Sequence, residues 1–177
     1  PVYRAVNACL VFLPMLQGKR VYTVEGLAEG EALHPAQQAM VELRASQCGY
    51  CTPGIAMALF EATYRSDLEG VPWAMDDQVA GNLCRCTGYR PIREAARQVA
   101  GLRPEDRFAA VLRSAQPADM GLSYQTSDQL YLQPATLEGL WTALAEHPDA
   151  TVVAGGNDLG LDVTKGGARF AVAISLE

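Results

Sequence analysis

QCGYCTPG at residues 47–54 and NLCRCTGY at residues 82–89 hold four of the five cysteines of this chain. Cys48 and Cys51 have the spacing C-x2-C, whereas Cys84 and Cys86 have the spacing C-x-C. Within five residues of each pair stands a proline that suits the first turn of a helix. Four thiols held in two tight bends predict an inorganic centre. Cys48, Cys51, Cys84 and Cys86 are called the four site cysteines below.

The spacing alone leaves three interpretations of these cysteines open. Four cysteine ligands are typical of a structural zinc site, and they are equally the ligands of a [2Fe-2S] cluster. The third interpretation is a thioredoxin-like redox pair, because Cys-Gly-Tyr-Cys precedes a helix whose N-terminus would lower a thiol pKa. A thioredoxin-like motif should follow a strand, but the residues before Cys48 have a helical pattern, which disfavours this interpretation. The residues themselves do not separate iron from zinc.

The composition disfavours several classes of partner. The chain has 177 residues and a formal net charge of −6, and its 14 lysines and arginines are scattered without a basic stripe. Nucleic acid and an anionic membrane surface are therefore disfavoured. Because no apolar run approaches the length of a membrane span and nothing indicates secretion, we expect reduced, metal-bound thiols in a cytoplasmic protein.

Residues 26–101 have the pattern of a small helical bundle. Pro35, Pro53 and Pro91 each stand where a helix can begin. Apolar residues then recur at helical spacing on one face of each segment: Ala36, Ala39, Met40 and Leu43; Ile55, Leu59 and Ala62; Ile92, Ala95, Ala96 and Val99. A shorter helix is expected over residues 75–82. The two cysteine stretches precede helices at corresponding places, which predicts two helical hairpins related by an internal pseudo-twofold axis.

The segment before this bundle, residues 1–25, has a strand-like composition. Residues 21–24 are β-branched or aromatic, and residues 5–11 are mostly apolar, so that either a strand or buried core is expected there. Two short strands do not form a stable sheet alone. We therefore expect residues 1–25 to be the end of a β-rich domain that continues before this chain.

The segment after the bundle changes its pattern twice. Residues 102–129 lack a sustained period and are predicted to be a linker. Residues 130–177 then combine strands with one amphipathic helix, which predicts the start of an α/β domain. The expected strands span residues 130–132, 151–154 and 170–176, and the expected helix spans residues 137–144.

Four further residues have structural interpretations. His34 and His147 each precede a proline at a helix end, so we expect capping or solvent exposure rather than metal ligation. Trp73 and Trp141 are expected in the core.

The segment around the four site cysteines closely resembles the iron–sulfur region of the molybdenum hydroxylases, a family of xanthine dehydrogenases, aldehyde oxidases and carbon monoxide dehydrogenases. The resemblance covers roughly residues 5–101 and the start of the last segment. It implies that the four site cysteines ligate a [2Fe-2S] cluster in a helical domain with internal twofold symmetry, and it favours iron over zinc. It also implies that Gln47 contacts the pterin of a molybdenum cofactor on a separate domain. Without the resemblance, Gln47 is a polar residue after a helix.

Cys9 resembles the last ligand of a second cluster in the same family. That cluster is of the plant ferredoxin type, with the spacing C-x4-C-x2-C followed by a distant fourth cysteine. Taken alone, Cys9 would be a small buried apolar residue. The first three cysteines of the pattern are absent from this chain. The second [2Fe-2S] cluster therefore requires residues that this chain does not supply.

A flavin site is predicted near the C-terminal end of the chain. A strand that runs into two glycines presents successive backbone N–H groups to an anion, although a plain turn is the more common meaning of a double glycine. The stretch resembles the pyrophosphate-binding loop of the FAD domain in the same family, whose members often have Thr in place of Asn157. The other FAD contacts of the family lie beyond this chain. The residues of the predicted site are Val152, Val153, Ala154, Gly155, Gly156, Asn157, Asp158 and Leu159.

The predicted fold is multidomain. It comprises the end of a β-rich, plant-type ferredoxin domain over residues 1–25 and an α-helical [2Fe-2S] bundle with an internal pseudo-twofold over residues 26–101. A linker over residues 102–129 follows, and residues 130–177 are the N-terminal part of an α/β FAD-binding domain.

The resemblance implies that this chain is the electron-transfer part of a xanthine dehydrogenase-like oxidoreductase of purine catabolism. Substrate hydroxylation would occur at a molybdenum centre on a large partner subunit or domain, and no catalytic residue is expected here. Electrons would pass through the two [2Fe-2S] clusters and FAD to NAD or another acceptor, within a hetero-oligomer. The alternative is a zinc-stapled helical interaction module without redox activity.

Overall fold

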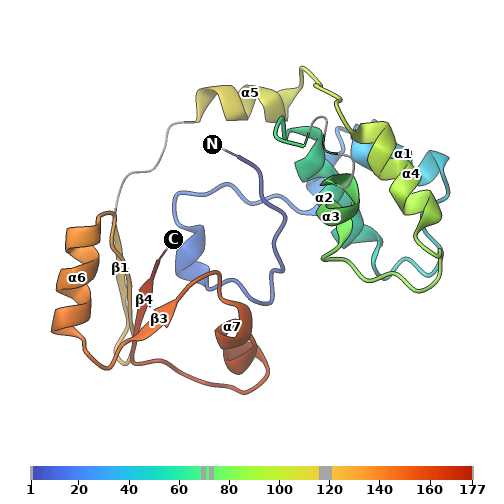
Figure 1. The fold of residues 1–177 in the computed structure, drawn as a ribbon. Helices are drawn as coiled ribbons and strands as arrows, with labels where there is room; N and C mark the ends of the chain where they lie inside the picture. Colours follow the sequence, from blue (N-terminus) through green and yellow to red (C-terminus); the bar gives the residue numbers. More distant parts are fainter. Residues whose placement is uncertain (1, 69–70, 72–73, 116–120, 177) are drawn as a thin grey trace. The chain divides into compact units, whose positions relative to one another are not determined.

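The computed structural model describes residues 2–68, 71, 74–115 and 121–176. The chain divides into two compact units (Figure 1). The first unit comprises Pro1–Ala5 and Tyr22–Gln116, and the second unit comprises Val6–Val21 and Pro117–Glu177. The first unit holds the 3-10 helix η2 (Val24–Leu27) and the helices α1 (Pro35–Glu42), α2 (Thr52–Thr63), α3 (Ala74–Val79), α4 (Arg90–Val99) and α5 (Arg107–Ser114). The second unit holds the 3-10 helix η1 (Leu13–Leu16), the strands β1 (Leu122–Gln125), β2 (Leu130–Gln133), β3 (Thr151–Val153) and β4 (Val172–Ser175), and the helices α6 (Leu137–Glu146) and α7 (Asn157–Thr164).

The helices that the sequence predicts over residues 26–101 are present in the first unit. Pro35 is the first residue of α1, and Pro53 and Pro91 are the second residues of α2 and α4, where their missing N–H groups would have no partner within the helix. His34 caps α1, because its Nδ1 atom accepts the N–H of Ala36 at 3.1 Å. The helix expected over residues 75–82 is shorter and ends at Val79.

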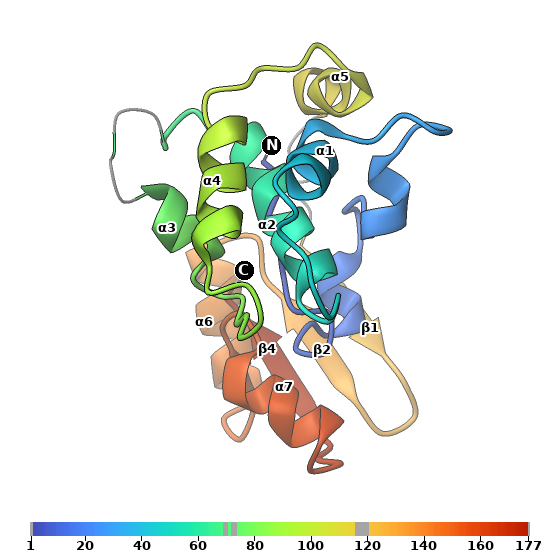
Figure 2. The ribbon, with the colours of Figure 1, turned by 90° about the vertical axis from the view of Figure 1, so that its right-hand side faces the viewer.

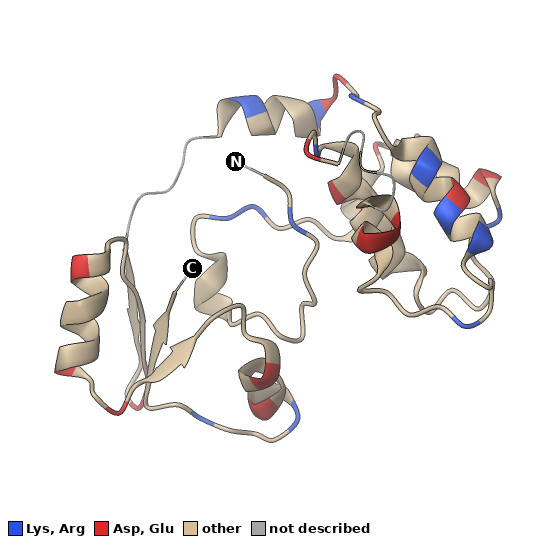
Figure 3. Ribbon diagram, in the orientation of Figure 1, with Lys and Arg blue, Asp and Glu red and all other residues tan. Residues whose placement is uncertain are grey.

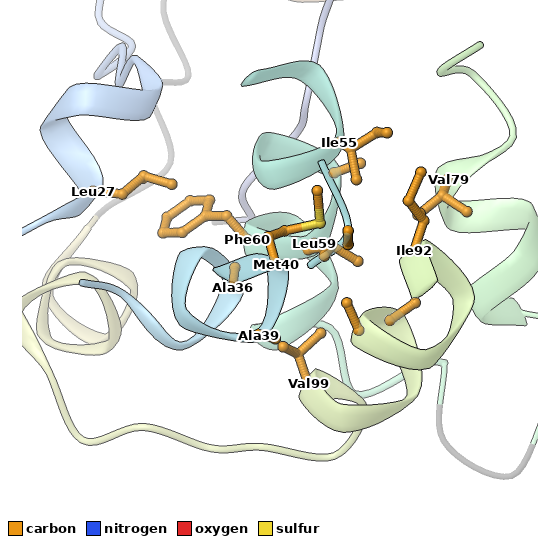
Figure 4. Close-up of a cluster of buried hydrophobic side chains, with 14 of the residues drawn as sticks. Leu27, Ala36, Ala39, Met40, Ile55, Leu59, Phe60, Val79, Ile92 and Val99 are labelled. Carbon is orange, nitrogen blue, oxygen red and sulfur yellow. The ribbon is translucent and has the colours of Figure 1, made fainter. Parts of the chain in front are cut away.

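The core of the first unit lies between these helices. Helix α1 contacts α2 and α4, and α2 contacts α3 and α4. Figure 4 shows Met40 of α1, Leu59 of α2 and Ile92 and Val99 of α4 directed toward one another. Each of these side chains is at most 3% exposed. Burial of one such side chain contributes about 1.5–3 kcal/mol to folding, so the periodic apolar faces of the sequence account for this bundle.

The segment predicted as an irregular linker, residues 102–129, instead contains helix α5 and strand β1. Helix α5 belongs to the first unit, because Phe108 is 2% exposed and its ring contacts Phe60 of α2 and Tyr64, which directly follows α2. Asp106 caps α5 by accepting the N–H groups of Phe108 and Ala109. Helix α5 has only eight residues, and Phe108 is its one buried residue. The sequence therefore shows no repeated apolar pattern from which this helix could be predicted.

The second unit is a small α/β sheet with the strand order β1-β2-β4-β3. Strand β1 pairs antiparallel with β2, and β4 pairs parallel with both β2 and β3. Helices α6 and α7 lie on opposite faces of the sheet (Figures 1 and 2). Strands β2, β3 and β4 and helix α6 confirm the elements expected after residue 130, whereas helix α7 was not expected. Trp141 on α6 is 64% exposed, so its expected place in the core was wrong; Trp73 lies outside the described residues.

The described residues of the N-terminal segment, 2–25, form no strand, which corrects the strand expected over residues 21–24. The strand or buried core expected over residues 5–11 is also wrong, because residues 5–9 are exposed and not in a strand. Tyr3 and Tyr22 pack against the core of the first unit, whereas Met15 packs in the core of the second unit. A strand requires a neighbouring strand for its backbone hydrogen bonds, and no sheet edge pairs with these residues in the described chain. The assignment of residues 1–25 to a separate ferredoxin domain stays a prediction, as does the internal pseudo-twofold.

Charged side chains of both signs occur in both units (Figure 3). The densest row of basic residues is Arg90, Arg93 and Arg97 on α4. Arg93 forms two hydrogen bonds with Asp76 on α3, at 2.7 and 2.6 Å, and Arg90 pairs with Glu94 at 3.1 Å. Two of the three charges are thus compensated within the unit. In the part of the chain that the structure describes, no helix has the length and the apolar character needed to cross a membrane.

Candidate iron–sulfur site

Two loops of the first unit bring the four site cysteines together. One loop joins α1 to α2 and carries Cys48 and Cys51, and the other joins α3 to α4 and carries Cys84 and Cys86. Each loop turns at a glycine in the left-handed region, Gly49 with φ 83° or Gly88 with φ 65°, a conformation that costs glycine little. The chain forms a helix–loop–helix unit from α1 to α2 and another from α3 to α4. Each cysteine pair therefore lies between the ends of two helices.

The two loops are also in contact away from the sulfur atoms. A side chain at Gly54, in the first turn of α2, would collide with the Oδ1 atom of Asn82, which precedes the second cysteine pair. Ser46 and Thr52 close the first loop through a hydrogen bond of 2.6 Å between their hydroxyl groups. The hydrogen bond between Ser46 and Thr52 thus joins the two ends of the first loop, and Asn82 of the second loop packs against Gly54.

The thiols meet as two pairs, each with one member from each loop. The Sγ atom of Cys86 donates a hydrogen bond to the Sγ atom of Cys48 over 3.4 Å. Cys51 and Cys84 are likewise hydrogen-bonded to each other. The first pair is exposed, whereas Cys51 is half-buried and Cys84 is only 2% exposed. The site thus has an inner pair within the unit and an outer pair that faces solvent.

The hydrogen bonds around the sulfur atoms create two acidic and two less acidic thiols. The hydroxyl group of Thr87 lowers the pKa of Cys84 to about 7, with further help from backbone N–H groups. The backbone N–H of Tyr50, and then the thiol of Cys86, lower the pKa of Cys48. The hydrogen bond to Cys48 raises the pKa of Cys86. Burial, followed by the bond to Cys84, raises the pKa of Cys51. In each pair, therefore, one thiol has a lowered pKa and the other a raised pKa.

Thr87 and Tyr89 form a small network with Cys84. The Oγ1 atom of Thr87 lies 3.0 Å from the Sγ atom of Cys84. The phenol oxygen of Tyr89 accepts the backbone N–H of Cys84 at 3.0 Å, and the backbone N–H of Tyr89 donates to the Thr87 hydroxyl at 3.2 Å. Tyr89 has φ 64°, a conformation that is uncommon outside glycine. The sequence reasoning did not single out these two residues, although both directly follow the C-x-C pair.

The donor set is suitable for an iron–sulfur cluster. A [2Fe-2S] cluster takes four thiolates, two on each iron, and the four site cysteines are close neighbours within one unit. Around them, hydroxyl and backbone N–H groups provide the second shell of donors that such centres use. Among residues 2–68, 71, 74–115 and 121–176, no three His, Cys, Asp or Glu side chains are arranged to hold a single metal ion.

The rim of the site is exposed and partly apolar. Tyr50, between Cys48 and Cys51, is 95% exposed, and Leu83, beside Cys84, is 77% exposed. Gln47, which the resemblance assigns to a pterin contact, is also exposed. It therefore lies beside the outer cysteine pair, with its side chain available to a partner.

Cys9 lies outside the first unit. It belongs to the second unit and is exposed. Its neighbour Leu10 packs closely on α7: a Cβ atom at Gly160 would lie 2.7 Å from the Leu10 carbonyl oxygen, and one at Gly156 would collide with the same oxygen. Glycine is thus required at both positions by the approach of the Cys9 segment.

The segment predicted to bind flavin runs from strand β3 into helix α7. Strand β3 ends at Val153, and Gly155 and Gly156 follow with φ 68° and 81° before α7 begins at Asn157. Ala154, Gly155, Asn157 and Asp158 are exposed, and Val152 is 42% exposed, whereas Val153 and Gly156 are buried and Leu159 is half-buried. The first-turn N–H groups of a helix that follows such a loop can receive an anion. The Leu10 carbonyl oxygen occupies the side of Gly156 that a side chain would fill.

Comparison with known proteins defines the class of the site. The sequence model of a family described as "[2Fe-2S] binding domain" matches residues 23–97. These residues therefore belong to the [2Fe-2S] binding domains, and the zinc and thioredoxin interpretations lose their support.

The chain is also similar to parts of xanthine dehydrogenases, which are oxidoreductases. It is 48% identical over 106 residues to xanthine dehydrogenase from Dictyostelium discoideum, covering 59% of this chain and 8% of that protein. It is 30% identical over 203 aligned positions to xanthine dehydrogenase/oxidase from Rattus norvegicus, covering 92% of this chain and 15% of that protein. Among solved structures, an aldehyde oxidoreductase from Desulfovibrio desulfuricans is 33% identical, with a TM-score of 0.34, covering 55% of this chain and 11% of that one. The chain thus spans only a small part of the relatives that it matches.

Proposed function

We propose that this chain is the electron-transfer part of a xanthine dehydrogenase-like molybdenum hydroxylase. In this proposal the first unit holds a [2Fe-2S] cluster on Cys48, Cys51, Cys84 and Cys86. The observation that carries the proposal is the meeting of these four thiols, from two loops far apart in the sequence, with Cys48 and Cys86 at 3.4 Å. The match of residues 23–97 to the [2Fe-2S] binding domains supports the same assignment.

The role of the first unit is to position the cluster and to set its potential. The iron–sulfur centre supplies one-electron transfer, and the bond chemistry on the substrate belongs to a molybdenum centre on a partner subunit or domain. The exposed outer pair and the exposed Gln47 and Tyr50 are the part of the site nearest to solvent. We assign this rim to the side from which electrons arrive, with Gln47 as the residue that contacts the molybdenum cofactor.

The second unit is proposed to receive the electrons on FAD. The loop from Val152 to Leu159 would bind the pyrophosphate through its backbone, and NAD or another acceptor would reoxidise the flavin. Cys9 would ligate a second [2Fe-2S] cluster together with cysteines that this chain does not contain. The complete assembly would be a cytoplasmic hetero-oligomer. The alignment that covers 92% of this chain reaches into the second unit and supports this arrangement.

Anaerobic purification followed by metal and sulfide analysis tests the proposal. The expected result is a brown protein with about two irons and two labile sulfides per chain, the content of one [2Fe-2S] cluster. A colourless protein that binds one zinc ion and no sulfide would overturn the proposal in favour of a zinc-stapled helical module, because four thiolates are also the ligands of structural zinc.

A further inference from the structure

The Thr87 hydroxyl group has one hydrogen atom, and its neighbours determine where that atom points. The Thr87 oxygen already accepts the backbone N–H of Tyr89 at 3.2 Å. The sulfur atom of Cys84 lies 3.0 Å away on the other side. A thiolate bound to iron carries no hydrogen, so in the assembled site the hydroxyl group must donate and the sulfur must accept. The hydroxyl hydrogen is therefore directed at the buried ligand.

We propose that Thr87 is a positioning residue that raises the reduction potential of the cluster through its hydrogen bond to Cys84. This inference rests on the proposed function, because it requires the four site cysteines to carry the cluster. Thr87 acts through Cys84 and is not itself a ligand.

The direction of the effect follows from charge. When the centre takes up one electron from a reductant, no ligand bond has to form or break, and the site gains one negative charge. Part of that charge resides on the cysteine sulfur atoms, and a hydrogen bond to sulfur stabilises it more strongly after reduction than before. Hydrogen bonds to the sulfurs are among the factors that set cluster potentials. Because Cys84 is only 2% exposed, water cannot readily replace the hydroxyl group.

The neighbouring hydroxyl groups have other partners. Those of Ser46 and Thr52 bond to each other at 2.6 Å. The phenol oxygen of Tyr89 accepts the backbone N–H of Cys84 at 3.0 Å, so that it fixes the ligand's backbone rather than its sulfur. Substitution of Thr87 is therefore the change that tests a hydrogen bond from a hydroxyl group to a cysteine sulfur.

The test is a redox titration of the full chain with dithionite and mediators, in which the visible absorption reports reduction. Thr87→Val keeps the shape of the side chain and removes the hydroxyl group. We expect iron and sulfide contents equal to wild type and a midpoint potential below the wild-type value. Thr87→Ser, which retains the hydroxyl group, should return the potential toward wild type. Thr87→Ala removes the hydroxyl group with less bulk and should lower the potential as Thr87→Val does.

Thr63→Val is the matched control. Thr63 is fully buried in the same unit, and its hydroxyl group donates to the carbonyl of Leu59 at 2.8 Å. It stands twelve positions after Cys51, at the other end of α2, and thus about 18 Å along the helix from Cys51. This variant should keep the wild-type potential.

Each outcome decides between the alternatives. An unchanged potential in Thr87→Val and Thr87→Ala with intact clusters overturns the proposal while leaving the proposed function in place. Failure of both variants to assemble a cluster that Thr87→Ser assembles also overturns it, because the hydroxyl group would then serve assembly. A wild-type chain without iron overturns the proposed function, and this inference with it.

Discussion

At the scale of single residues, the five cysteines differ in what surrounds their sulfur atoms. Cys84 is buried and receives the Thr87 hydroxyl group, and Cys86 bonds to Cys48. Cys9 is exposed and belongs to the other unit. Identical side chains thus have different roles, and substitution by alanine separates these roles.

Cys86→Ala should abolish the cluster, because three thiolates do not complete the ligand set of two irons. It should also lower the stability of the first unit, since the bonds between metal and ligands contribute to folding. Iron and sulfide analysis together with the visible spectrum measures the first effect, and thermal unfolding measures the second. Cys9→Ala is the control and should keep about two irons per chain. An intact two-iron spectrum in Cys86→Ala would exclude Cys86 as a ligand.

His34 makes the stability of the first unit depend on pH. Burial lowers its pKa below 6.5, against the opposing effect of Asp106. Its Nδ1 atom accepts the N–H of Ala36, and its Nε2 atom bonds to the Tyr64 hydroxyl group, which donates to Asp106. The neutral ring is therefore required, because protonation of Nδ1 would remove the cap of α1.

The sign of this dependence follows from linkage. The unfolded chain binds a proton at His34 at higher pH than the folded chain does, so the contribution is complete above about pH 6.5 and is lost as the pH falls below that value. His34→Asn retains a capping side chain that does not titrate. In urea unfolding of the metal-free chain at pH 7.5 and 5.5, wild type should lose more stability than His34→Asn. The same substitution at His147, in the second unit, is the matched control. Equal losses in wild type and His34→Asn would contradict the prediction.

At the scale of elements, short helices owe their positions to a few close contacts. Helix α5 is held by Phe108 and by Arg107, whose guanidinium group donates to the carbonyl of Gly26 at 2.7 Å and to that of Ala28 at 3.0 Å. Helix α7 is approached by the backbone of Leu10 at Gly156 and Gly160. Contacts of this kind join segments that are distant in the sequence.

Gly160→Ala should destabilise the second unit, although the same change in an exposed helix interior stabilises by about 1 kcal/mol. The added Cβ atom would lie 2.7 Å from the carbonyl oxygen and 2.8 Å from the Cα atom of Leu10, so the backbone must move away. Protease cleavage within residues 6–21 should become faster, and the unfolding temperature of the second unit should fall. Gly26→Ala is the control, because nothing lies within 4 Å of its added Cβ atom. Cleavage at the wild-type rate in Gly160→Ala would refute the close approach.

At the scale of the whole molecule, the two units have separate cores. The first core joins α1, α2 and α4 with Phe108 of α5, and the second joins Tyr131, Val153 and Ala173 of the sheet with Met15. The proposed metal lies within the first unit alone. Stability that comes from the metal should therefore be confined to that unit.

Removal of the cluster with a chelator should lower the unfolding temperature of the first unit and leave that of the second unit unchanged, because a ligand stabilises only the unit that binds it. Hydrogen exchange with mass spectrometry, before and after iron removal, measures the two units in one sample. Faster exchange is expected in α1, α2 and α4, with unchanged exchange in β2, β3 and β4. Equal acceleration in both units would show that they unfold together.

The sequence by itself determined the main helices of the first unit and indicated which four cysteines belong to one site. Apolar residues at 3.6-residue spacing and three prolines were sufficient for α1, α2 and α4, because these signals are local. The cysteine spacings and the two glycines that follow β3 are also local signals, because each can be recognised within a few residues of sequence. The sequence did not reveal α5, α7 and β1, the exposure of Trp141 or the absence of a strand before residue 25. The reason is that burial and pairing depend on neighbours far along the chain.

Tertiary structure alone decided how the four site cysteines meet. It paired Cys48 with Cys86 and Cys51 with Cys84, placed one pair in solvent and the other inside, and brought the Thr87 hydroxyl group to the buried sulfur. It also placed Cys9 in the second unit and set Leu10 against Gly156 and Gly160. The physical reason is that spacing limits which residues can be neighbours along one loop, whereas burial and hydrogen bonding between loops arise only when the helices that carry them pack.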